Sequence, residues 1–222
     1  MATLETWDLY NQFMLRGELD RFTKLLARYE LFKMIVDVPG DIVEAGVLKG
    51  AGLLFWAKLI QIYNPLSRRK VVGFDTFEGY PTDSSRDYDN QTAQEFTQTQ
   101  ISSPDLVSEK AIMELAAAQG LVHRIELVKG DARQTVEGYV QANPGFRVAL
   151  LNMDFVLFEP TKASLSHLLP RVIKGGVVAL DEYAIGNKGE SEAVDELLHD
   201  SAIKLQSFPW AKSPTAYFVK KA

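Results

Sequence analysis

Short β-prone runs alternate with segments of helical periodicity along most of this 222-residue chain. Five such runs have the length of strands: residues 41–43, 70–74, 125–129, 148–153 and 177–180. Between them, apolar residues recur every three or four positions, which predicts helices from about residue 50 and at 108–119, 134–142 and 161–173. Strands that are joined by helices pair in parallel, so the alternation predicts an α/β sheet with helices on both faces.

The two ends of the chain depart from this alternation. Residues 1–38 have helical spacing up to Pro39-Gly40, which predicts a helical segment before an α/β domain over residues 39–222. Near the other end, the β-prone runs 203–208 and 215–219 are too close in the sequence for a crossover helix. They should pair antiparallel. We therefore expect a mostly parallel seven-stranded sheet with an antiparallel C-terminal hairpin strand.

A long polar segment, residues 81–105, interrupts the alternation after the second predicted strand. Connections of this length in a compact domain are more often lids or binding loops than idle links. We expect a lid over a binding site, with a solvated insertion as the alternative.

The composition argues against several classes of protein. The chain has no cysteine, so it has neither disulfides nor thiolate metal sites, and three histidines leave little for a zinc site. The net charge of −5 and the pI near 5.3 argue against a general nucleic-acid or anionic-membrane surface. The start does not resemble a signal peptide and no apolar run has the length of a membrane span, so we expect a cytoplasmic protein.

The sequence that ends the first predicted strand is E-x-G-x-x-x-G, from Glu44 through Gly46 to Gly50. Gly46 allows a tight turn, and Gly50 allows the next helix to approach a ligand closely. A dinucleotide site has the spacing G-x-G-x-x-G, and its close second glycine is missing here. The leading acid suits a ligand with an ammonium group, such as the methionine half of S-adenosylmethionine. An ordinary turn with a helix-packing glycine is the alternative.

An acid ends or follows each of the five predicted parallel strands, at the edge of the sheet where ligands of such folds bind. Asp75 follows the second strand, near the position of the acid that binds ribose hydroxyls in Rossmann-type domains. Asp131 follows the third strand, where a carboxylate can accept a hydrogen bond from an adenine amino group. For both residues a loop cap is the alternative.

Three further acids should lie together, because Asp154 follows the fourth strand and Asp181 and Glu182 follow the fifth. Three carboxylates in one cleft repel one another unless a proton or a cation intervenes. Mg²⁺ binds through a few carboxylates and keeps positions open for water and substrate oxygens. We therefore predict a magnesium site at these residues, with Asp154 as the candidate catalytic base. The alternative is that Glu182 faces solvent and Asp181 caps the next turn.

Four segments of the chain resemble the macrocin-type O-methyltransferases, which act on sugars in natural-product biosynthesis. They are VEAGVLKG (43–50), GFDTFEGYP (73–81), LFEPTKASL (157–165) and GGVVALDEY (175–183). The resemblance implies a class I methyltransferase fold of the Rossmann-like type, with S-adenosylmethionine and Mg²⁺ as cofactors. It implies a catalytic domain over residues 39–222, and an acceptor site or oligomer contact in residues 1–38.

The resemblance also implies a role for each matching residue. Glu44, Gly46 and Gly50 would hold the methionine part of the cofactor, Asp75 its ribose and Asp131 its adenine region. Asp154, Asp181 and Glu182 would bind the metal. The implied function is methyl transfer to a hydroxyl of a sugar or glycoside. Apart from the resemblance, apolar positions of the N-terminal segment such as Phe22, Leu26 and Phe32 need a surface to bury them, so we expect a homo-oligomer. The acidic charge predicts no nucleic-acid or membrane partner.

The chain departs from the family pattern at two positions. Val156 stands where many members have a second acid, and Glu182 stands where an aspartate is usual. Val156 is the one hint of the first alternative function, a cofactor-binding protein without catalytic activity.

A nicotinamide-dependent nucleotide-sugar oxidoreductase or epimerase is the second alternative function, which the glycine spacing disfavours. Its usual Tyr-x-x-x-Lys pair occurs only outside the expected region, at Tyr29 with Lys33 and Tyr217 with Lys221.

Overall fold

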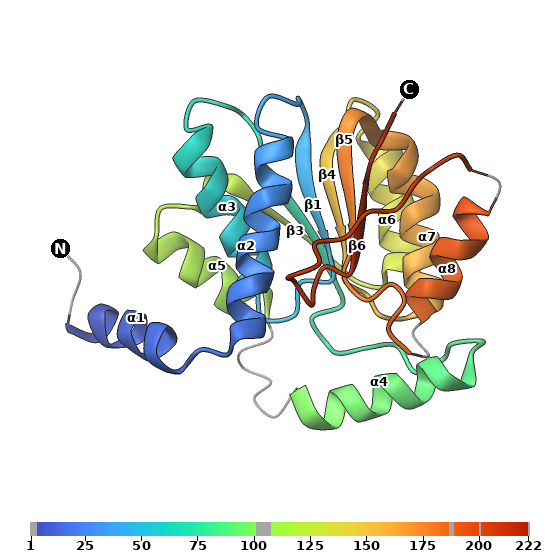
Figure 1. The fold of residues 1–222 in the computed structure, drawn as a ribbon, viewed down its shortest axis with the longest axis horizontal. Coiled ribbons are helices and arrows are strands. Elements are labelled where there is room, and N and C mark those ends of the chain that lie inside the picture. Colours follow the sequence, from blue (N-terminus) through green and yellow to red (C-terminus); the bar gives the residue numbers. More distant parts are fainter. Residues whose placement is uncertain (1–3, 101–107, 187–188, 200, 222) are drawn as a thin grey trace.

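The computed structural model describes residues 4–100, 108–186, 189–199 and 201–221. Within this part of the chain, six strands form one sheet in the order β3-β2-β1-β4-β5-β6 (Figure 1). The first five strands are parallel to one another, and β6 is antiparallel to β5. The predicted α/β class, mostly parallel with an antiparallel C-terminal strand, is confirmed.

The elements have the following bounds. The strands are β1 (Asp41–Ala45), β2 (Val71–Asp75), β3 (Ile125–Lys129), β4 (Val148–Met153), β5 (Val172–Leu180) and β6 (Ala216–Val219). The helices are α1 (Leu4–Arg16), α2 (Leu19–Met34), α3 (Ala51–Tyr63), α4 (Asp87–Gln100), α5 (Glu109–Ala118), α6 (Ala132–Ala142), α7 (Phe158–Leu168) and α8 (Gly189–Leu198). Short 3-10 turns precede β3 (Val122–Arg124) and β5 (Leu169–Arg171).

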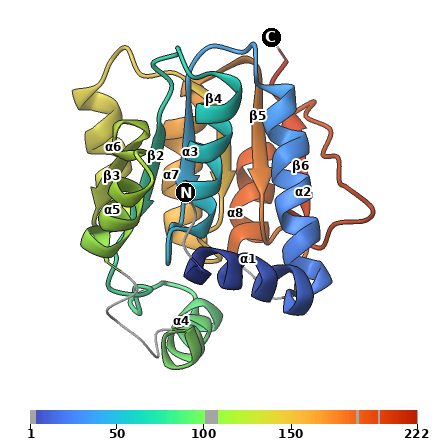
Figure 2. The same ribbon diagram turned by 90° about the vertical axis from the view of Figure 1, so that its left-hand side faces the viewer.

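Helices cover both faces of the sheet, as Figures 1 and 2 show. Helices α2, α3 and α5 pack on one face around buried residues such as Phe32, Trp56 and Ile112. Helices α6, α7 and α8 pack on the other face around Val136, Leu165 and Val194. Strands with both faces covered are mostly apolar, and β4 is buried over its whole length.

The strand order reverses between β1 and β4, which are neighbours in the sheet. Chain connections leave this pair in opposite directions, so a crevice forms beyond its carboxyl ends, where open α/β sheets bind ligands. In Figure 1, α4 runs across this edge of the sheet, and α1 lies at the same end of the molecule. None of the described helices is both long and apolar enough to cross a membrane.

The predicted count of seven strands is wrong, because the described residues form six. Residues 203–208 pair with the sheet only through a single bridge, in which Gln206 and Tyr217 exchange two backbone hydrogen bonds of 2.8 Å. The apolar residues of this run, Ile203 and Leu205 among them, pack only partly against the core. Because this run buries little apolar surface, a longer strand here would gain little stability from pairing with the sheet.

Strand β5 begins at Val172, five residues earlier than the pattern predicted. Gly175 and Gly176 hid its first half, because glycine is depleted in strands. The β4–β5 register shifts at this point, between Val148 and Leu150, and Gly175 has φ +82°. Glycine inside a strand often marks such an irregularity.

The polar segment expected as a lid contains a helix, α4, that the sequence pattern did not reveal. Its apolar residues are too few for a clear helical stripe. Residues 81–100 lie within the described part of the chain, whereas residues 101–105 of the predicted lid lie outside it.

Candidate functional site

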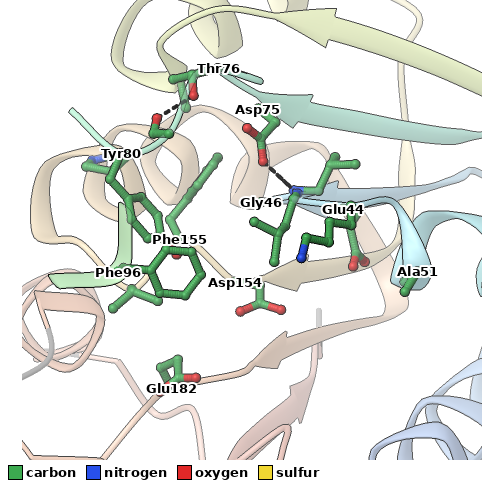
Figure 3. Close-up of a pocket in the computed structure, with 18 of the residues that line it drawn as sticks. Glu44, Gly46, Ala51, Asp75, Thr76, Tyr80, Phe96, Asp154, Phe155 and Glu182 are labelled. Carbon is green, nitrogen blue, oxygen red and sulfur yellow. Dashed lines mark hydrogen bonds between the residues drawn. The ribbon is translucent and has the colours of Figure 1, made fainter. Parts of the chain in front are cut away.

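A cavity of about 680 Å³ lies beyond the carboxyl ends of the parallel strands (Figure 3). Its walls come from the turn after β1, the segments after β2, β3 and β4, helix α2 and the lid segment. The predicted site residues that line it are Glu44, Gly46, Asp75, Asp131, Asp154 and Glu182. The other two, Gly50 and Asp181, are buried and are not among the lining residues.

Both motif glycines adopt backbone conformations that favour glycine, and their surroundings explain why. Gly46 has φ +101°, and a Cβ there would lie 2.2 Å from the backbone oxygen of Asp154. Gly46 therefore lets the turn after β1 pass directly against the end of β4. Gly50 has φ +80° and precedes α3, and its Cβ would point at Ile112 of α5 rather than into the cavity. The close approach predicted for Gly50 is thus to another helix.

Asp75 forms hydrogen bonds to the loops after β1 and β2, beside the cavity. Its Oδ2 accepts hydrogen bonds from the backbone N–H groups of Val47 (2.7 Å) and Leu48 (2.9 Å), and its Oδ1 accepts one from Phe77 (2.8 Å). A carboxylate has about four acceptor positions, so capacity remains for a ribose hydroxyl.

Asp131 caps helix α6, which is the role that the sequence analysis gave as the alternative to ligand binding. Its Oδ1 accepts a hydrogen bond from the backbone N–H of Arg133 (2.9 Å), and its Oδ2 accepts one from the Arg133 Nε (2.8 Å). The residue also lines the cavity, so capping and ligand binding are compatible at this position.

Asp154, Asp181 and Glu182 do converge, and their carboxylate oxygens lie within 4.8 Å of one another. Asp181 is fully buried, and its Oδ1 has no hydrogen-bond partner among the described residues. The backbone N–H of Glu182 donates to Oε1 of the buried Glu190 (2.9 Å), which holds the loop after β5 in place. Burial and the charge of Asp181 raise the pKa of Asp154 to about 8.

Two basic residues of α2 lie against these acids, and the sequence analysis did not predict them. Lys24 Nζ donates to Asp181 Oδ2 (2.6 Å) and to Asp154 Oδ2 (3.3 Å). Arg28 Nη2 lies 3.6 Å from the same Asp154 oxygen. Burial opposes the charged form of Lys24, but the charges of Asp154 and Asp181 outweigh it and raise its pKa.

Glu44 is held by partners on two helices. Its Oε1 lies 3.2 Å from Arg28 Nη2, and its Oε2 accepts a 2.6 Å hydrogen bond from Trp56 Nε1. A Cβ at Gly52 would come within 2.1 Å of both Arg28 and Glu44, so this buried ion pair requires a glycine in α3. The predicted role of Glu44 toward a ligand would therefore be shared with Arg28.

Aromatic rings form the wall opposite the glycine turn. Tyr80 lies in the segment before α4 and Phe96 lies in α4. Their rings pack edge to face with centroids 4.8 Å apart, and Phe155 lies beside them (Figure 3). Burial and the neighbouring carboxylates, led by Asp154, raise the pKa of Tyr80, so its hydroxyl stays protonated. The placement of Phe96 at the cavity supports the interpretation of residues 81–100 as a lid.

The sequence did contain a signal for the two α2 cations. Lys24 and Arg28 are four residues apart and share a face with the buried Leu31, so they interrupt an apolar stripe at helical spacing. Val156, the departure from the family pattern, is buried with φ +68° and lines the cavity. A β-branched residue in this conformation is an outlier, and such strain tends to occur at functional sites.

The sheet order and the cavity at its switch point define a class I methyltransferase fold. The solved structure of the calicheamicin methyltransferase CalS11 matches it with a TM-score of 0.79 and 31% identity, covering 98% of this chain and 86% of that one. The O-methyltransferase NovP shares the fold, with a TM-score of 0.76 and 24% identity over 90% of this chain and 80% of that one. The chain belongs to the TylF macrocin-O-methyltransferase family, whose model matches residues 19–209.

Curated relatives carry the names of sugar O-methyltransferases. One from Streptomyces olivaceus, an 8-demethyl-8-(2,3-dimethoxy-alpha-L-rhamnosyl)-tetracenomycin-C 4'-O-methyltransferase, is 30% identical over 73% of this chain and 58% of its own length. A mycinamicin III 3''-O-methyltransferase from Micromonospora griseorubida is 26% identical over 67% of this chain and 57% of its own length. The chain therefore spans little more than half the length of the curated relatives it matches.

Proposed function

We propose that this protein transfers a methyl group from S-adenosylmethionine to a sugar hydroxyl in natural-product biosynthesis. The observation that carries the proposal is the position of Asp154, at the switch point and between the glycine turn and the aromatic wall (Figure 3). Family membership and the names of the relatives support the reaction class. They favour it over the nicotinamide-dependent alternative, and neither Tyr-x-x-x-Lys pair lines the cavity.

The cofactor would lie along the ends of β1, β2 and β3. Gly46, Asp75 and Asp131 all line the cavity; Asp75 has acceptor positions left for ribose hydroxyls, and Asp131 would border the adenine end. Glu44 and Arg28 together offer one carboxylate and one guanidinium for the amino acid part of the ligand. When bound, S-adenosylmethionine would supply an electrophilic methyl group on a sulfonium, and S-adenosylhomocysteine would be the leaving group.

Asp154 would accept the proton that the acceptor hydroxyl loses. In the metal-free site, burial and the charge of Asp181 raise the pKa of Asp154, which favours proton acceptance, whereas a bound cation would lower that pKa. Charge is neutralised as the bond to carbon forms, so positioning of the two reactants should contribute most of the acceleration. The cavity walls supply that positioning.

The acidic cluster fits a divalent cation. Three oxygen ligands lie within 4.8 Å of one another, and the buried Asp181 Oδ1 lacks a partner among the described residues. We propose that Asp154, Asp181 and Glu182 hold Mg²⁺ there. The ion would supply positive charge that lowers the pKa of an acceptor hydroxyl.

The acceptor would enter between the N-terminal helices and the lid. Phe13 of α1, and Arg21 and Leu25 of α2, line the cavity, as do the rings of Tyr80 and Phe96. Aromatic rings pack well on the apolar faces of sugars. Relatives are named for glycosides and, in the case of CalS11, for TDP-rhamnose, so both classes of acceptor belong in an assay.

The proposal is tested first by ligand-induced thermal shifts. A ligand that binds only the native state stabilises it by about 2.7 kcal/mol at a hundred times its dissociation constant. S-adenosylhomocysteine should raise the melting temperature, whereas NAD and NADP should not. The opposite pattern would reject the proposed cofactor.

Turnover is tested with a panel of sugar nucleotides and glycosides, followed by mass spectrometry for a gain of one methyl group. Asp154→Asn should lower kcat by about a hundredfold or more if Asp154 is the base. The exposed Asp83→Asn serves as the matched control, because it changes the same functional group away from the acidic cluster. Normal turnover of Asp154→Asn would place the base elsewhere.

A further inference from the structure

Lys24 occupies the space between two of the proposed metal ligands. Its ammonium donates to Oδ2 of Asp181 at 2.6 Å and to Oδ2 of Asp154 at 3.3 Å. Only 20% of its side chain is exposed, and the Asp181 side chain is 1% exposed, so little water separates the charges. The contact joins α2 to the ends of β4 and β5, well over a hundred residues away in the sequence.

This ammonium already performs one task that the sequence analysis assigned to a metal. When both are ionised, Asp154 and Asp181 repel each other, and a cation between them offsets that repulsion. Arg28, one turn further along α2, adds a second positive charge near Asp154 and Glu44. The acidic cluster is therefore held together by the chain itself.

An ammonium and a divalent ion cannot share this place. Mg²⁺ requires oxygen ligands at about 2.0–2.1 Å in near-ideal octahedral geometry. An ion held by Asp154 and Asp181 would be close to the Lys24 ammonium that contacts both carboxylates, and the two positive charges would repel each other. Lys24 has a long flexible stem and lines the cavity, so its ammonium can leave the carboxylates without moving α2.

We infer that Lys24 and a divalent cation compete for Asp154 and Asp181, so that Lys24 stabilises the metal-free site and sets the affinity of the metal. The inference rests on the proposed Mg²⁺ site. It assigns to α2, outside the family motifs, a residue that determines how readily the metal binds.

The test is calorimetric titration of Mg²⁺ alone into the metal-free protein, without cofactor or acceptor. Lys24→Met should bind Mg²⁺ more tightly than the wild type by about tenfold or more, which is a common size for coupling between two binding events. Lys24→Arg keeps the charge and should retain weak binding. Lys33→Met, an exposed lysine of the same helix paired with Glu30, is the matched control and should behave as the wild type.

The outcomes separate the inference from the function on which it rests. Equal or weaker binding by Lys24→Met overturns the competition and leaves the metal site standing. Absence of binding to both proteins overturns the metal site and the inference together. Loss of binding when Asp181→Ala is added to Lys24→Met would locate the measured ion in this cluster, and binding that survives this change would overturn the inference.

A second measurement needs only the wild-type protein, in case Lys24→Met fails to fold. Acetylation of Lys24 by an amine-reactive reagent is compared with that of Lys33 by mass spectrometry, with and without Mg²⁺. The relative labelling of Lys24 should rise when Mg²⁺ saturates the protein, because its ammonium leaves the carboxylates. Protection that is unchanged by saturating Mg²⁺ would show that Lys24 stays in place, and the inference would be wrong.

Discussion

At the scale of single residues, Asp75 connects stability to cofactor binding. Asp75→Ala would leave the N–H groups of Val47, Leu48 and Phe77 without their acceptor. Each buried group that loses its partner costs about 1–3 kcal/mol, so both the melting temperature and the affinity for S-adenosylhomocysteine should fall. Denaturant unfolding and calorimetry measure the two effects. The exposed Asp37→Ala, in the loop before β1, should change neither, and an Asp75→Ala protein of normal stability would contradict this account.

Asp154 should contribute to the pH dependence of stability in the absence of metal, together with Glu44 and Glu190, whose pKa values burial also raises. Burial and the charge of Asp181 raise the pKa of Asp154 from 3.8 to about 8. Between these values the native state holds a proton that the unfolded chain has lost, so the free energy of unfolding falls as the pH rises. Asp154→Asn should flatten this dependence, measured as melting temperature against pH in the presence of a chelator. A slope equal to that of the wild type would show that other groups dominate.

At the scale of elements, the sequence predicted the strands and helices that have a clear local pattern of apolar residues. The five parallel strands and the helices α3, α5, α6 and α7 follow from apolar periodicity, as does the position of the acids after the strands. Helix α4 has too few apolar residues for this signal, and the glycine pair at Gly175 masked the start of β5. The convergence of Asp154, Asp181 and Glu182 was predictable because neighbouring parallel strands end at one edge.

The contacts between distant segments were not predictable in the same way. Lys24 and Arg28 lie on a helix that precedes the whole sheet, and nothing in their local sequence states which face of the sheet that helix covers. Gly52 is explained only by the ion pair that passes beside it. These contacts depend on how α2 and α3 pack together, which is a property of the assembled fold.

Asp89 of helix α4 connects this helix to the start of α7 through a hydrogen bond. The buried Asp89 accepts a 2.7 Å hydrogen bond from the backbone N–H of Phe158, at the start of α7, where Leu157 provides no side-chain cap. Asp89→Ala should therefore cost about 1–2 kcal/mol of stability, as loss of a helix cap does. It should also speed limited proteolysis within residues 81–100. The exposed Asp87→Ala, in the same helix, should do neither; equal proteolysis of both variants would contradict an anchoring role for Asp89.

At the scale of the whole molecule, α1 leaves a large apolar surface uncovered. It stands away from the sheet in Figure 1, joined to α2 by stacking of Phe13 on Phe22. Exposed apolar residues gather along it and at the start of α2: Trp7, Leu9, Tyr10, Met14, Leu15 and Leu19. Contiguous patches of this kind usually mark interaction surfaces.

We predict that this surface joins two or more copies of the chain and that the association supports catalysis. Because Phe13 lines the cavity, a neighbour that fixes α1 would also fix the acceptor side of the site. Light scattering at micromolar concentration should give at least a dimer, and Leu15→Glu combined with Leu19→Glu should give monomers with a raised KM for the acceptor. Leu66→Glu, at a fully exposed loop position far from α1, should leave both unchanged. A monomeric wild-type protein at this concentration would overturn the prediction, which rests on the free-energy cost of leaving so much apolar surface in water.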